Sequence, residues 1–121
     1  MTPAEASQLL AIAASADNRK PNAIAAKFWA TTLDGYRLAD CEQAIARHYG
    51  RSNEFIMPFH VISAVRAIRY ERLEAHIQKY GPLQPPADLD PDDTGAYADW
   101  LQDEQTRIAN GDDEPPALEA S

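Results

Sequence analysis

The sequence predicts an all-α protein: a small four-helix bundle over residues 1–81, followed by an acidic, largely disordered tail with one short amphipathic helix. Three observations predict this class. Apolar residues recur every three or four positions, which is the spacing of one face of a helix. Capping residues or a proline stand where these periodic stretches begin. Residues 1–81 contain no alternation of apolar and polar side chains long enough to predict a strand.

The first helix is expected from about Pro3 to Ala16. Thr2 and Glu5 have the spacing of a capping box, in which each side chain accepts a hydrogen bond from the other residue's backbone N–H. Pro3 suits the first helical position, because an N–H there would have no partner within the helix. The apolar stripe of this helix consists of Leu9, Ile12, Ala13 and Ala16, with Leu10 beside it.

The second helix is expected from about Asn22 to Leu33, after a polar break at residues 17–20. It ends at Asp34-Gly35, because glycine readily adopts the left-handed conformation that follows a helix. Trp29 is expected to be a core residue. Two adjoining rows run along this helix: Ile24, Phe28 and Thr32, and Ala25, Trp29 and Leu33.

Two more helices complete the expected bundle. The third runs from Asp40, which forms a capping pair with Gln43, to Gly50. The fourth and longest covers about residues 58–79 and stops at Gly81-Pro82. The apolar face of the third helix consists of Cys41, Ala44, Ile45 and His48.

The net charge changes sign after residue 81. Residues 1–81 hold ten Lys/Arg and eight Asp/Glu, a net charge of +2, whereas residues 82–121 hold one Arg and eleven Asp/Glu, a net charge of −10. Such asymmetry is typical of an interaction tail attached to a folded module. We therefore expect a helical bundle domain at 1–81, a Pro/Asp-rich linker at 82–93, an amphipathic tail helix at 94–110 and a disordered acidic C-terminus at 111–121.

The tail helix has one apolar face. Asp93 or Thr94 can cap its start, and Asn110-Gly111 ends it. A helix of this length is marginal alone in water, so it is expected to dock. We consider three alternatives for where it docks. It could bind a groove on a partner protein, lie near the arginines of its own domain, or fold back as a fifth structural helix. The predicted partner-binding residues are Tyr97, Trp100, Leu101 and Ile108.

Arg66, Arg69 and Arg72 recur along one side of the fourth helix. They could contact nucleic-acid phosphates or an acidic partner protein. The alternative is that these arginines form a solvated face. This alternative is favoured over DNA binding, because a domain charge of +2 is weak for phosphate binding. The sequence therefore predicts at most a weak DNA contact.

The sequence predicts no enzyme, no cofactor and no metal site. His48, His60 and His76 have no second His, Cys or acid at metal-ligand spacing. Cys41, the only cysteine, falls on an apolar helix face and is expected to be a buried structural thiol. The sequence has no glycine loop for phosphate and no apolar run of bilayer length, and we expect no signal peptide. We expect a cytoplasmic protein without membrane contact.

Residues 1–75 resemble the phage replicative-helicase loader and inhibitor family. The likeness rests on packing motifs rather than on a catalytic signature. These motifs are a capped first helix leading to Leu9-Leu10, Trp29 with Leu33 and Tyr36, Cys41 to Ile45 with His48-Tyr49, and Phe55-Ile56-Met57-Pro58 before Val61-Ile62.

The resemblance implies a helical N-terminal domain with a mobile C-terminal segment that engages the hexameric replicative helicase, an ATPase. The protein would help to deliver the helicase to a phage origin complex, which includes an origin-binding protein, while holding its activity in check. By position, the tail helix would be the helicase-binding element. Two alternatives stay open: a small DNA-binding or regulatory protein that acts through its arginines, and a phage inhibitor of another host protein.

Overall fold

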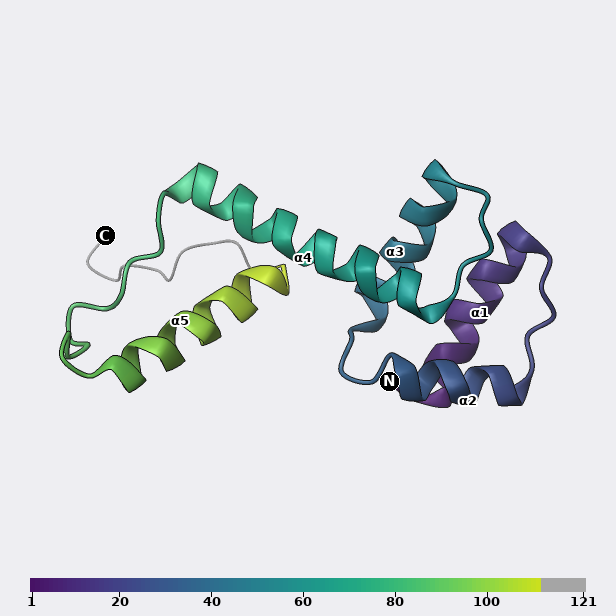
Figure 1. Ribbon diagram of the computed structural model, residues 1–121, viewed down its shortest axis with the longest axis horizontal. Helices are drawn as coiled ribbons and strands as arrows, with labels where there is room; N and C mark the ends of the chain where they lie inside the picture. The colour runs from purple at the N-terminus through teal and green to yellow at the C-terminus, as the bar shows by residue number, and fades with distance from the viewer. Residues whose placement is uncertain (112–121) are drawn as a thin grey trace. The chain divides into compact units, whose positions relative to one another are not determined.

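The computed structural model describes residues 1–111, which contain five helices and no strand. The predicted all-α class is therefore confirmed for this part of the chain. Contacts divide the chain into two compact units, residues 1–68 and residues 69–121, so that the division falls inside the fourth helix. The helices are α1 (Pro3–Asp17), α2 (Ala23–Thr32), α3 (Leu38–Arg51), α4 (Pro58–Tyr80) and α5 (Thr94–Ala109) (Figure 1).

The capping signals at the start of α1 and α2 act as expected. Thr2 N donates to Glu5 Oε1 over 2.9 Å and Glu5 N donates to Thr2 Oγ1 over 3.1 Å, which confirms the capping box. The Asn22 side chain accepts from Ala25 N over 2.8 Å and caps α2. At the other end of α1, Asn18 adopts a left-handed conformation with φ of 62°.

The predicted start of α3 was wrong. The helix begins at Leu38, two residues before Asp40, and Arg37 precedes it without a side-chain cap. Asp40 is buried within the first turn instead of standing before the helix. Leu38 packs against the core three positions before buried Cys41, so both lie on one helix face. Burial of this face, rather than a local cap, sets where α3 begins.

The helix α4 ends close to the expected position. Gly81 has φ of 88° and donates its N–H to Ile77 O over 2.7 Å. This left-handed conformation favours glycine, because it brings a Cβ too close to the carbonyl oxygen. Pro82 follows, and it has no N–H to continue the helix.

The first unit holds most of the core. α1 packs against both α2 and α3 (Figure 1). Trp29 is only 3% exposed, which confirms it as a core residue, whereas Ile24 and Phe28 on the adjoining row of α2 face solvent. From α4, the residues up to Ile68 contribute to the same core. The largest fully buried side chains of this unit are Leu9, Leu10, Leu33, Ile45, Ile56, Val61, Val65 and Cys41.

The second unit consists of the later part of α4, the linker and α5. Residues 82–93 contain turns but no helix or strand. The bounds of α5 lie within one residue of those expected for the tail helix, and its N-cap is Asp93, whose side chain accepts from Ala96 N over 2.9 Å. The C-terminal segment predicted to be disordered lies outside the described residues, apart from Gly111. Among residues 1–111, no helix has the length and apolar character to cross a membrane.

Candidate functional site

The apolar face of α5 is covered unevenly along its length. Tyr97 is 42% exposed and Trp100 and Leu101 are half-buried, whereas Ile108 is completely buried. The rings of Tyr97 and Trp100 lie against each other, with centroids 5.8 Å apart. The four predicted partner-binding residues therefore form a half-open aromatic end and a closed end.

Two of the three predicted arginines close the C-terminal end of α5. Arg72 Nη1 donates to the backbone oxygen of Ala109 over 2.8 Å, and Arg69 Nη1 donates to Asn110 Oδ1 over 2.6 Å. The last carbonyl groups of a helix have no partner within it and carry its negative dipole end, so a guanidinium there is favourable. Arg66 belongs to the other unit and is exposed.

A shallow pocket of about 220 Å³ lies beside this contact, within the second unit. Tyr70 on its rim is exposed and bonds to Glu74, which raises the pKa of the phenol. The lining combines polar side chains with the apolar groups of Leu73 and Ala109, so the pocket is an open margin of the α4–α5 contact. Its residues are Arg69, Tyr70 and Leu73 of α4 with Gln102, Gln105, Thr106 and Ala109 of α5.

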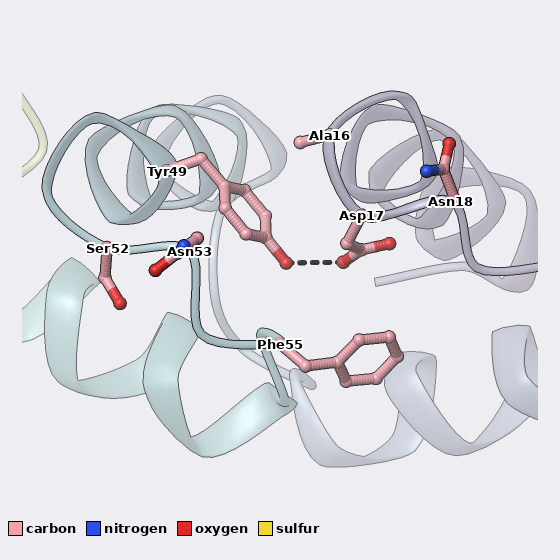
Figure 2. Close-up of a pocket in the computed structure, with 7 residues that line it drawn as sticks. All are labelled: Ala16, Asp17, Asn18, Tyr49, Ser52, Asn53 and Phe55. Atoms are coloured by element: carbon pink, nitrogen blue, oxygen red, sulfur yellow. Dashed lines mark hydrogen bonds between the residues drawn. The ribbon is translucent and has the colours of Figure 1, made fainter.

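Sequence reasoning missed a polar network in the first unit. Tyr49 donates its hydroxyl hydrogen to Asp17 (Figure 2), and Arg19 Nε donates to both oxygens of Asp17 over 2.9 and 3.0 Å. Arg19 Nη2 also donates to Ile56 O over 2.7 Å, while Ile56 N donates to Tyr49 Oη over 3.0 Å. The network thereby joins the segment after α1, the end of α3 and the loop before α4.

The Arg19 guanidinium also contacts two aromatic rings. It lies 3.7 Å from the centroid of Phe55 and 5.5 Å from that of Trp29, both within the range of a cation–π interaction. Trp29, Tyr49 and Phe55 are all among the residues that carry the family resemblance. In this fold Trp29 and Phe55 lie against one guanidinium, and Tyr49 is joined to it through Asp17.

The electrostatics of this network favour a structural role over a catalytic one. The hydrogen bonds from Arg19 lower the pKa of Asp17 to about 2, so its carboxylate is a weak base. Burial, and then the hydrogen bond to Asp17, raise the pKa of Tyr49. The adjacent cavity of about 380 Å³ is lined largely by polar groups (Figure 2): Asp17, Asn18, Tyr49, Ser52 and Asn53, with Ala16 and Phe55.

The remaining residues with reactive side chains have other roles. Cys41 is buried as predicted, and its burial raises the pKa of the thiol to about 11. His48 Nε2 donates to Glu54 O over 2.6 Å, and His60 Nδ1 accepts from Met57 N over 2.9 Å, so both histidines order the loop before α4. Within residues 1–111, no group of three or more His, Cys, Asp or Glu side chains could hold a metal ion.

Comparisons with known proteins give no relative for this chain. No protein-family model matches it, and neither a curated protein nor a solved structure does.

Proposed function

We propose that this protein is a non-enzymatic adaptor in phage DNA replication that binds the hexameric replicative helicase and loads it or holds it inactive. In this proposal residues 1–81 act as a small four-helix bundle. Residues 82–121 act as an acidic tail that reaches the helicase in the cytoplasm of the host cell. The proposal takes the helicase partner from the resemblance in sequence, and two of the residues that carry this resemblance, Trp29 and Phe55, lie against Arg19.

The observation that carries the proposal is the half-open aromatic end of α5. Tyr97 is 42% exposed, and Trp100 and Leu101 beside it are half-buried. A 16-residue helix is stabilised mainly by burial of its apolar face, so this exposed part of the face is available to a partner. Tyrosine and tryptophan are the residues that most often dominate binding energy at protein interfaces. The acids on the same helix, including Asp99 and Asp103, would limit association with other acidic surfaces and favour a basic partner.

The experiment is a pull-down of the replicative helicase by the full chain and by the double variant Trp100→Ala, Leu101→Ala. Loss of a dominant contact costs about 2 kcal/mol or more, so the affinity should fall by roughly 30-fold. Phe28→Ala is the matched control, because it removes an exposed aromatic ring from α2 without changing the tail. Equal binding by the double variant and the wild type would eliminate α5 as the contact.

A further inference from the structure

The two ends of the apolar face of α5 differ in what covers them. The Tyr97 end is partly open to solvent, whereas Ile108 has no exposed surface and Ala109 is 8% exposed. Ile108 is one of the residues through which the helicase contact is proposed. In the present conformation this residue is therefore inaccessible to any partner.

Two arginines of α4 bond to the residues that directly follow Ile108. Arg72 bonds to the carbonyl of Ala109 and Arg69 bonds to the side chain of Asn110, the residue at which α5 ends. Both donors are cationic, so these hydrogen bonds are charge-assisted, and they complement the negative end of the helix dipole. Arg72 thus caps a backbone carbonyl at the C-terminal end of α5, and Arg69 bonds to the side chain of the residue at which the helix ends.

The contact between α4 and α5 includes charge-assisted hydrogen bonds, but it buries few residues of α5. Only Ile108 and Ala109 of α5 are buried, and the other residues of the helix are half-buried or exposed. A contact that depends on a few polar bonds and one apolar side chain can open without unfolding the separate core of the first unit.

We propose that the α4–α5 contact is an autoinhibitory latch: Arg69 and Arg72 hold the end of α5 closed over Ile108, and the helicase binds α5 only after this end is released. The inference rests on the proposed function, because it concerns access to the same helix face. The apparent dissociation constant of such a site equals the intrinsic constant divided by the open fraction. Weakening the latch should therefore strengthen binding, which is the opposite of what removal of a direct contact does.

Three full-length variants distinguish a latch from a direct contact with the helicase. Arg72→Ala removes the bond to Ala109, and Asn110→Ala removes the acceptor of Arg69 without changing any arginine. Arg66→Ala is the matched control, because it removes an exposed arginine from the same helix outside the second unit. Amide hydrogen exchange over residues 102–109 reports opening in the absence of any partner, and titration with the purified replicative helicase reports affinity.

The latch predicts that Arg72→Ala and Asn110→Ala each raise the exchange rates of residues 102–109 by about tenfold and tighten helicase binding severalfold, since a charge-assisted bond has been lost. Arg66→Ala should change neither quantity. Unchanged exchange in the first two variants would overturn the latch, whatever the helicase does. Faster exchange with weaker helicase binding would also overturn it, because these residues would then face the partner.

A different outcome would show that the proposed function, rather than the latch alone, is wrong. In that case exchange rises as expected in Arg72→Ala and Asn110→Ala, yet neither these variants nor the wild type binds the helicase. The α4–α5 contact would then be a structural docking of a fifth helix, and the autoinhibitory role would be rejected together with the helicase assignment.

Discussion

The hydroxyl of Tyr49 donates a hydrogen bond to the carboxylate of Asp17, although the two residues lie 32 positions apart in the chain. The same carboxylate is held by Arg19 from its own segment, so Asp17 joins a local contact to a long-range one. Tyr49 Oη in turn accepts the N–H of Ile56, a residue with no exposed surface. Removal of this hydroxyl therefore affects two polar groups at once.

Tyr49→Phe should lower the free energy of unfolding by about 1–3 kcal/mol, because it leaves the buried Ile56 N–H without its acceptor and removes a donor from Asp17. Urea denaturation followed by circular dichroism measures the change. Tyr70→Phe is the control: it removes an exposed hydroxyl that bonds to Glu74 and should change stability by less than about 0.5 kcal/mol. Equal effects in the two variants would contradict a buried network.

The lowered pKa of Asp17 predicts a specific loss of stability in acid. The pKa is about 2 in the folded protein and 3.8 in the reference state, so the folded state favours the ionised form. A lowered folded pKa contributes stability that is present above about pH 4 and is lost as the pH falls through about 2. The contribution at neutral pH is on the order of 2 kcal/mol.

The comparison of wild type with Asp17→Asn isolates this contribution from that of the other acids. The difference in unfolding free energy between the two proteins should shrink by about 2 kcal/mol between pH 5 and pH 2. Chemical denaturation at several pH values in this window provides the measurement. A difference that stays constant with pH would show that Asp17 does not titrate with a lowered pKa.

Cys41 should be inert in the folded protein. It has no exposed surface, and burial followed by the negative charge of Asp40 raises the pKa of its thiol to about 11. Since the thiolate is the reactive form, modification by a chromogenic disulfide reagent should be slower than for an exposed cysteine by a factor of about 100 or more. Ser7→Cys places such a thiol at an exposed position of α1, and denaturant should make both cysteines react equally fast.

The DNA-binding alternative makes a different prediction for Arg66. If the protein acted through phosphate contacts, Arg66→Glu would weaken binding to single-stranded DNA and reduce its dependence on salt concentration. Under the adaptor proposal the substitution should leave helicase binding unchanged. Fluorescence anisotropy with a labelled oligonucleotide at two salt concentrations tests the first outcome, and the helicase titration tests the second. Tight, salt-sensitive DNA binding lost in Arg66→Glu would favour the alternative.

The helices themselves were predictable because their signals are local. The capping box of Thr2 and Glu5, the cap at Asp93 and the glycine after α4 act over at most four residues, so sequence spacing identifies them. Trp29 was predictable as a core residue for the same reason, since it lies in an apolar row of α2. The start of α3 was not predictable from the sequence, because burial of Leu38 outweighed the capping pattern at Asp40.

The sequence by itself determined the all-α class, the bounds of most helices and the tail helix with its apolar face. Only the tertiary structure decided which polar groups meet: Tyr49 with Asp17, and Arg72 with the carbonyl at Ala109. Helix formation depends on neighbours within one or two turns, which the order of residues specifies directly. Contacts between residues some 30 or more positions apart depend on how the helices pack, and no spacing along the chain specifies that.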